Sequence, residues 1–281
     1  MLLSLGMQIA AQQRAAFWAD PFFSLFKDNG PGAIFNSAVD AANLLTADGS
    51  DLAPYDGPVG QVRDTSRGGP SAATSRPRLA QPVLANRPTR VQVDGVAALE
   101  LNGTNQRLEG NATARDILKG APGAEFHTAI SWAGGFRPLL AISTASANVS
   151  RLQLQILATG GLKLFVRRGD GDGFVELDSA AGVITQNVRV IVGASVDYLN
   201  GGSEAIKIWA NGQVVATAAL SGTGNTTDVA SAQALIGSNL NASTFFSGLI
   251  FREIPITARV LGTAERSAMI ARLAALTGVS L

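Results

Sequence analysis

The chain has no cysteine and a single histidine, His127, among its 281 residues. The absence of thiols excludes a disulfide framework, a thiolate metal site and a cysteine nucleophile. With one histidine, no histidine pair in the chain can bind a metal, and a Ser-His-Asp triad would have to use His127. Because His127 falls in a strand-like run and no G-x-S-x-G elbow is present, we interpret it as a plain surface or edge histidine.

Charge and long apolar runs are also scarce. Charged residues make up 15% of the chain against 46% hydrophobic residues, and the net charge is +1. No run approaches the roughly 18 apolar residues that cross a bilayer, so we expect no membrane insertion. The N-terminus lacks a positively charged region before its apolar residues, so we do not expect a cleaved secretion signal. The arginines between residues 61 and 90 form a small basic patch without aromatics, and we expect them to pair with carboxylates of a neighbouring chain or segment rather than with nucleic acid.

The clearest structural signal is the segment 204–215, which reads E-A-I-K-I-W-A-N-G-Q-V-V. Its Asn-Gly pair tolerates positive φ and lies between two runs that suit pleated strands, which predicts a β-hairpin. The two isoleucines share one face of the first strand, and Lys207 and Trp209 share the other. If that second face meets solvent, Trp209 is the best exposed aromatic ring in the chain. If a neighbour covers it, Trp209 is an interface anchor.

Short strand-like runs continue from Thr89 to Ile254, with turns about every eight to twelve residues. This spacing indicates an antiparallel two-sheet sandwich and a mainly β chain. Alternation in 152–156 predicts a half-buried strand. Asn111–Lys119 predicts a helix of two turns with Asn111 or Thr113 as N-cap. A terminal amphipathic helix is predicted over 263–277, with Thr263 as N-cap, a stop at Thr277-Gly278, and one face formed by Met269, Ile270, Leu273 and Leu276.

We divide the chain into an N-terminal attachment segment (1–35), an irregular wrap (36–90) and the β domain with its terminal helix (91–281). Clustered aromatics mark the first segment, and we expect them either to dock it on its own domain or to insert into another subunit. They are Phe17, Trp18, Phe22, Phe23 and Phe26. Gly, Pro and Ser dominate the second segment, for which a disordered linker is the alternative.

The sequence contains one candidate for a catalytic site, a pair of carboxylates. Glu176 and Asp178 occupy alternate positions of a strand, which gives the carboxylate spacing of roughly 5 to 9 Å that glycoside hydrolases need. The related glycosidase signature continues to a third acid, whereas Ser179-Ala180-Ala181 follows here. We therefore expect no catalytic residues and no enzyme.

A calcium loop is the corresponding metal candidate. A loop that starts at Asp170 would place Phe174 and Ala181 at ligand positions, and neither side chain binds calcium. We interpret 170–173 as a tight turn, and we expect no metal and no other cofactor.

Sugar binding remains as a candidate function. It typically uses an aromatic ring with polar side chains, in loops at one edge of a sandwich or on its concave face. Candidate loops are Ala145–Ser150, Tyr198–Ser203 and Ser221–Asp228, and the candidate ligand-binding residues are Trp209 and Tyr198 as stacking rings with Lys207, Asn200 and Asn225. The alternative is that Trp209 and Trp132 belong to the core and that the loops are merely solvated.

Two sets of motifs carry a resemblance to known families. The order of the hairpin at 206–215, I-G at 236–237, F-S-G-L-I-F-R-E at 246–253 and a terminal helix resembles the concanavalin A-like or laminin G-like jelly roll. The N-terminal half is similar to a series common in structural proteins of tailed phages and prophages. Its segments are F-W-A-D-P-F-F-S-L-F-K-D (17–28), P-V-G-Q-V-R-D-T-S-R-G-G-P (58–70), S-R-P-R-L (75–79) and A-L-E-L-N-G-T-N-Q-R-L (98–108).

This chain departs from that series in two places. Leu101-Asn102-Gly103 replaces Phe-Asp-Gly, and Arg67-Gly68 replaces part of Ser-Gly-Asn-Gly. These changes remove a carboxylate that would serve a metal, so no metal site is carried over.

The resemblance implies a virion protein located in a phage particle, such as a tail fibre, head spike or capsid-associated protein. It also implies binding to other virion proteins through the N-terminal segment, and assembly as a homo-oligomer. We expect a fibre or spike component that displays a lectin-like jelly roll for adhesion to bacterial surface polysaccharide during host attachment. The alternatives are a capsid or tail decoration protein that binds no glycan and, third, a polysaccharide-degrading enzyme.

Overall fold

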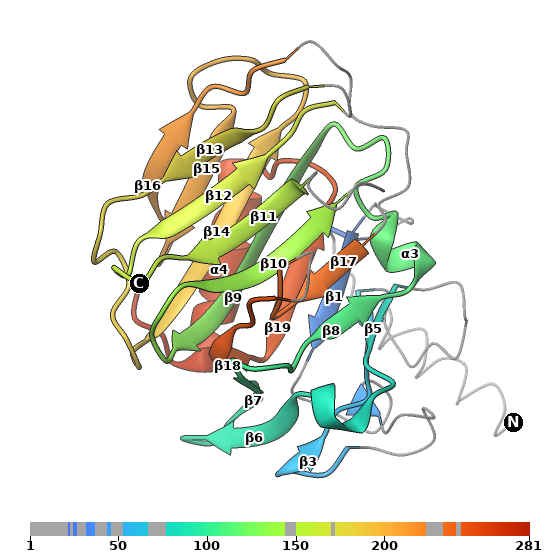
Figure 1. The fold of residues 1–281 in the computed structure, drawn as a ribbon. Coiled ribbons are helices and arrows are strands. Elements are labelled where there is room, and N and C mark those ends of the chain that lie inside the picture. The colour runs from blue at the N-terminus through green and yellow to red at the C-terminus, as the bar shows by residue number, and fades with distance from the viewer. Residues whose placement is uncertain are drawn as a thin grey trace, which may run out of the picture.

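The computed structural model describes residues 22, 25–26, 32–36, 44–45, 53–66, 77–143, 150–169, 172–222, 233–239 and 243–281. Over these residues the chain forms two antiparallel β-sheets packed as a sandwich, with the C-terminal helix α4 (Thr263–Thr277) against one of them (Figure 1). The predicted mainly β, two-sheet jelly roll with a terminal helix is confirmed.

Sheet A contains, within the described residues, ten strands in the order β16-β15-β14-β9-β18-β7-β6-β3, with β19 and β1 joined to β9 off this path. Its strands are β1 (Gly32–Asn36), β3 (Gly57–Pro58), β6 (Thr89–Val93), β7 (Val96–Asn102), β9 (Gly123–Trp132), β14 (Arg189–Asp197), β15 (Ile206–Ala210), β16 (Gln213–Ala218), β18 (Ser247–Phe251) and β19 (Glu253–Thr257).

Sheet B contains nine strands of the described chain in the order β13-β12-β11-β10-β17-β8-β5-β4-β2. Its strands are β2 (Leu44–Leu45), β4 (Gln61–Arg63), β5 (Arg78–Ala80), β8 (Leu108–Gly110), β10 (Arg137–Ser143), β11 (Ser150–Ile156), β12 (Leu162–Val166), β13 (Val175–Asp178) and β17 (Gln233–Ile236). Two short helices, η2 (Leu84–Asn86) and α3 (Ala112–Arg115), connect strands.

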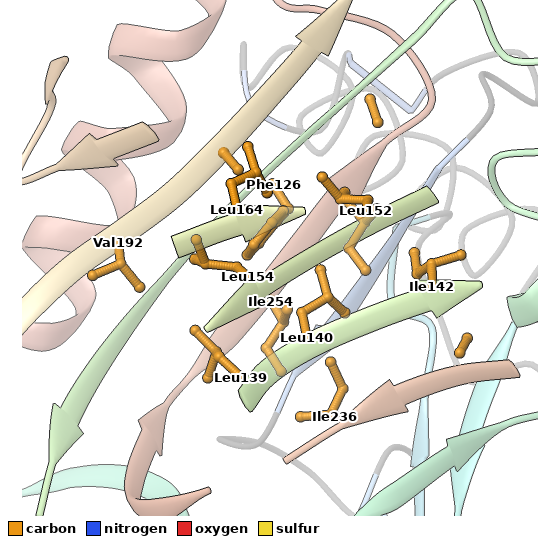
Figure 2. Packing of buried hydrophobic residues seen from close by; sticks show 14 of the residues in the cluster. Phe126, Leu139, Leu140, Ile142, Leu152, Leu154, Leu164, Val192, Ile236 and Ile254 are labelled. Atoms are coloured by element: carbon orange, nitrogen blue, oxygen red, sulfur yellow. The ribbon is translucent and has the colours of Figure 1, made fainter. Parts of the chain in front are cut away.

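The core between the sheets follows from the alternation of side chains along each strand. On β11, Leu152, Leu154 and Ile156 are fully buried in the main hydrophobic cluster. Figure 2 shows the leucines of β11 among side chains of the neighbouring strands and of sheet A, such as Leu140 and Phe126. Burial of side chains of this size stabilises the fold by about 1.5 to 3 kcal/mol each. The prediction of a half-buried strand is confirmed on its core side and wrong on the other, because Gln153 and Gln155 are also buried.

The predicted hairpin is present as β15 and β16, which pair at the end of sheet A. Asn211 and Gly212 adopt φ of 44° and 78°, the left-handed conformation that Asn-Gly tolerates. The Asn211 side chain also accepts a hydrogen bond from Ile191 N at 2.9 Å, which ties the turn to β14.

Helix α4 covers part of the outer face of sheet A, the face turned away from sheet B. Its N-cap is Gly262 rather than the expected Thr263, because the Glu265 carboxylate accepts a hydrogen bond from Gly262 N at 2.9 Å. It stops where predicted, at Gly278, which has φ of 70° and donates to Ala274 O. Its buried residues are Met269, Ile270, Leu273 and Thr277, so Thr277 takes the place expected for Leu276.

Two residues of the N-terminal aromatic cluster lie under the same helix. Phe22 and Phe26 are buried edge-to-face, with centroids 6.0 Å apart, and Arg272 of α4 lies 4.5 Å from the Phe22 ring centroid. They share a second hydrophobic cluster with outer-face residues of sheet A such as Ala129 and Phe251. Of the two predicted alternatives, these rings dock on their own domain, so they are not exposed for attachment to another subunit. Phe17, Trp18 and Phe23 lie outside the described residues.

The described parts of the predicted irregular wrap, 36, 44–45, 53–66 and 77–90, contribute short strands to both sheets. Strands of two or three residues are too short to show a periodic pattern, which is why the sequence indicated none. The buried carboxylate of Asp64 accepts hydrogen bonds from Ile34 N, Ser66 N and Ser66 Oγ, each at 2.9 Å. Asp64, within the 58–70 motif, therefore connects β1 to the residues that follow β4 by hydrogen bonds.

The short helix is also smaller than predicted. Asn111 is its N-cap, as expected, and its Oδ1 accepts from Ala114 N at 3.0 Å. The α-helix covers only Ala112–Arg115, one turn instead of two, and turns lead on to Gly120.

Candidate functional site

The face of β15 that carries Lys207 and Trp209 is covered around Trp209. Trp209 is 8% exposed, its Nε1 donates to Ser195 Oγ at 3.1 Å, and the Arg266 guanidinium of α4 lies 4.5 Å from its ring centroid. Helix α4 of the same chain, and not another subunit, covers this face around Trp209. Of the alternatives left open for this face, exposure of Trp209 to solvent is therefore excluded, and the ring is not free to stack on a sugar, which corrects its candidate role in ligand binding.

Beneath α4, Glu125 and His127 of β9 lie in a buried ionic network. Both side chains are 0% exposed, and the Glu125 carboxylate accepts hydrogen bonds from Arg266 Nε at 2.6 Å and Leu261 N at 2.9 Å. His127 Nε2 lies 2.9 Å from Glu125 Oε1. Burial alone would raise the pKa of Glu125, but the hydrogen bonds from His127 and Arg266 outweigh it and hold that pKa below its ordinary value.

The interpretation of His127 as a surface or edge histidine is thus wrong. It lies in the interior of sheet A, opposite Gly193 of β14. A Cβ at Gly193 would stand 2.2 Å from His127 Nδ1, so the missing side chain makes room for the imidazole. The pair between Arg266 of α4 and Glu125 of β9 holds the helix on the sheet. Because Glu125 and His127 are fully buried and Arg266 is only 12% exposed, the network offers little surface to a ligand.

The other predicted ligand-binding residues do not meet in one open site. Tyr198 is 2% exposed and belongs to the main core, which corrects its expected role as a stacking ring. Asn200 is exposed, and its Oδ1 accepts from Gly202 N at 2.8 Å within its own loop. Lys207 pairs with Glu204 at 2.8 Å. Asn225 lies outside the described residues.

The two carboxylates considered for catalysis lie on β13 at the edge of sheet B. Lys163 of β12 pairs with both, at 2.9 Å to Glu176 and 3.3 Å to Asp178. Asp170 lies outside the described residues, and Asp172 Oδ2 accepts from Gly169 N at 2.9 Å across the predicted turn. No group of three His, Asp or Glu side chains within the described ranges is placed to hold a metal ion.

An open groove lies on the outer face of sheet A beside the area that α4 covers. Its volume is about 400 Å³, within the range of roughly 300 to 1,000 Å³ typical of small-molecule sites. The floor is one cross-strand row, in which Leu249 of β18 lies opposite Glu100 of β7 and Ser131 of β9. The adjacent row on the same face, Ala98, Phe251 and Ala129, is buried in the second hydrophobic cluster. The groove is therefore the uncovered continuation of a packed surface.

Two walls of the groove are built on left-handed backbone. Asp56 and Asn187 both have φ of 60°, a conformation in which Asp and Asn are enriched. Asp56 N donates to Arg90 O at 2.6 Å, and Asn187 N donates to Trp132 O at 2.8 Å. These backbone bonds hold each polar side chain at the groove.

Four polar side chains of the groove are unused by the rest of the described chain, whereas the Gln92 side chain donates to Gly95 O at 3.2 Å. No hydrogen bond or ion pair from a described residue engages the side chains of Asp56, Glu100, Ser131 or Asn187. The groove also includes apolar surface from Val91, Val93 and Leu249. Carboxylates, an amide and a hydroxyl beside this apolar surface suit a ligand that has several hydroxyl groups and an apolar face.

Sequence reasoning missed this groove because its residues come from distant segments. The only local signal was the turn at Asp56-Gly57, which marks a loop without showing what it faces. Glu100 lies within the 98–108 motif, but nothing in the pattern of β7 shows which of its outward side chains α4 leaves uncovered.

No protein-family model matches the sequence, and no curated protein matches it. Among solved structures, Trypanosoma rangeli sialidase in complex with the inhibitor DANA is similar with a TM-score of 0.55 and 12% identity, over 94% of this chain and 38% of that one. The receptor binding domain of a botulinum neurotoxin C/D mosaic serotype is similar with a TM-score of 0.53 and 11% identity, over 86% of this chain and 51% of that one. A Ruminococcus gnavus IT-sialidase CBM40 matches with a TM-score of 0.49 and 17% identity, over 62% and 96% of the two chains.

At these identities the likenesses show a shared fold. In addition, none of the helices among the described residues is long and apolar enough to span a membrane.

Proposed function

We propose that the chain is a non-catalytic glycan-binding module and that the groove on the outer face of sheet A holds the sugar. The observation that carries the proposal is the set of unused polar side chains around an open groove of about 400 Å³. Sugar hydroxyls both donate and accept hydrogen bonds, so one ring can engage carboxylate, amide and hydroxyl groups at once.

The geometry of the floor supports the proposal. Glu100, Leu249 and Ser131 lie on neighbouring paired strands, so their relative positions are set by the sheet rather than by loops. A site on regular strands is held in place before the ligand arrives, which reduces the entropy lost on binding. The sialidase and the neurotoxin domain support it at the level of the fold alone.

We also propose that this module belongs to a phage-type particle, as a fibre or spike component that adheres to bacterial surface polysaccharide. Support comes from the motif series at 17–28, 58–70, 75–79 and 98–108. A decoration or cementing protein that binds no glycan is the alternative. Assembly as a homo-oligomer and binding to other virion proteins belong to both versions.

A glycan array tests the proposed function. The whole chain is applied to immobilised oligosaccharides and bacterial capsule and lipopolysaccharide fractions, with neutral, amine-bearing and acidic sugars represented. We expect retention on a subset of these glycans and release when the same soluble glycan is added. An absence of retention on every glycan overturns the proposal and favours the decoration protein. Cleavage of a retained glycan overturns the non-catalytic assignment.

A further inference from the structure

We propose that the groove prefers sugars that carry a protonated amine over neutral sugars, and that it rejects sialic and uronic acids. This inference rests on the groove being the glycan site. It begins with the charges of the lining: Asp56 and Glu100 contribute carboxylates, and Lys, Arg and His are absent from the described residues that form the groove.

Two arginines close to these elements are engaged by groups other than Asp56 and Glu100, and one of them, Arg189, donates to the carbonyl of the groove residue Val93 at 3.4 Å. Arg189, in the same row as Ser131, pairs with Asp94 at 3.3 Å and donates to Thr277 O at the end of α4. Arg90 of β6 donates to Ala53 O at 2.8 Å and lies 4.1 Å from the Tyr55 ring centroid. Neither arginine forms an ion pair with Asp56 or Glu100, whose negative charges are left for a ligand to neutralise.

The two carboxylates are exposed but stand in a concave, partly apolar setting. Opposite charges at about 4 Å interact more strongly in such a setting than in bulk water, and like charges repel to the same degree. An ammonium group on the sugar gains from this field, an N-acetyl group does not, and a sugar carboxylate is repelled. Because the two carboxylates are open to solvent, added salt must weaken the preference for amine-bearing sugars.

A matched set of soluble sugars tests this selectivity. The probes are the glucosamine tetramer, its fully N-acetylated counterpart, lactose and 3′-sialyllactose, titrated calorimetrically against the whole chain near pH 6 at low salt. We expect the glucosamine tetramer to bind about 10-fold or more tightly than the N-acetylated tetramer, lactose to bind more tightly than sialyllactose, and both differences to shrink in about 0.5 M salt. Equal affinities, the reverse order, or no binding of the glucosamine tetramer overturns the inference.

Isosteric variants link the preference to the groove. Glu100→Gln and Asp56→Asn each remove one charge, and Asn is well tolerated at the φ of 60° of Asp56. Each variant should reduce the preference for the amine about 5-fold. The control Glu109→Gln changes an exposed carboxylate of sheet B that pairs with Arg107 at 2.7 Å, and it should leave the preference unchanged.

These results separate the two proposals. If the chain binds array glycans but shows no preference for the amine, the selectivity inference fails and the glycan-binding module stands. If Glu100→Gln and Glu109→Gln change the preference equally, the groove is not its source. If the array retains nothing, the proposed function itself fails.

Discussion

Glu125→Gln should lower the free energy of unfolding by about 3 to 5 kcal/mol, the range observed when one partner of a buried ion pair is removed. The Glu125 carboxylate is fully buried and accepts two hydrogen bonds from Arg266, at 2.6 and 2.9 Å. A glutamine has one acceptor oxygen and no charge, so Arg266 is left in a largely buried site without its counter-charge. Urea denaturation at neutral pH, followed by circular dichroism, measures the change.

A matched surface variant provides the control. Glu176→Gln breaks the pair with Lys163 at 2.9 Å, but the Glu176 side chain is 48% exposed. Surface ion pairs of this kind contribute about 0 to 1 kcal/mol, so its unfolding curve should nearly match the parent. Similar destabilisation by both variants would contradict the assignment of Glu125 as the residue that secures α4 on sheet A.

The difference in stability between the parent and Glu125→Gln should also depend on pH, with a defined sign. The pKa of Glu125 is lowered in the folded state, so its ionised form favours folding. That contribution is fully present above the unfolded-state pKa, near 4.3, and is lost as the pH falls through the lower folded-state value. The stability gap between the parent and Glu125→Gln should therefore narrow as the pH is lowered from about 6 towards 3. A gap that widens in acid would contradict the network.

Glu100→Arg should weaken glycan binding at least about 20-fold. The substitution removes an acceptor from the groove floor and inserts a long cationic side chain between Leu249 and its neighbours. Loss of one partner of a buried, hydrogen-bonded charge pair typically costs about 2 to 5 kcal/mol. Glu100 is exposed in the free chain, so we expect at least about 1.8 kcal/mol, which corresponds to a 20-fold change. Calorimetric titration with the array glycan that binds the parent most tightly gives the affinity.

Glu109→Arg is the control for this prediction. Glu109 lies on β8 of sheet B, on a different sheet from the groove, and its side chain is 46% exposed. It should leave affinity unchanged, and the urea midpoints of both variants should stay close to the parent. Binding that survives Glu100→Arg would place the sugar elsewhere in the molecule.

Local sequence rules predicted the elements with strong periodicity or turn chemistry. The Asn211-Gly212 hairpin, the core side of β11 and the end of α4 at Gly278 all depend on residues that are close in sequence. Their conformations follow from the φ preferences of single residues and from the alternation of apolar and polar side chains. The tertiary contacts of this fold agree with these local preferences.

The errors arose where burial depends on a distant segment. Trp209 and His127 alternate with core residues as outward-facing side chains of sheet A do. Both are buried where Arg266 of α4, far along the chain, lies over the Trp209 ring and pairs with Glu125 beside His127. Strand periodicity identifies two faces but cannot show that a helix covers one of them. Gln153 and Gln155 lie on the outward side of β11 and are also only 6% and 5% exposed, although alternation alone predicts them to be open to solvent.

The groove could not be predicted for a related reason. Asp56, Glu100 and Asn187 are brought together by the order β9-β18-β7-β6 within sheet A, which the order of strands in the sequence does not reveal. Aromatic residues drew attention to Trp209 and Tyr198 because aromatic rings are common in sugar sites, whereas in this chain those rings stabilise the core.

The most direct test of the groove is amide chemical-shift mapping of the isotope-labelled chain during titration with the tightest array glycan. If the sugar binds as proposed, the largest shifts should cluster at Asp56, Glu100, Ser131, Asn187 and Leu249, with little change on β11, β12 and β13 of sheet B. Saturating shifts confined to the outward face of sheet B, around Gln153 and Lys163, would contradict the account.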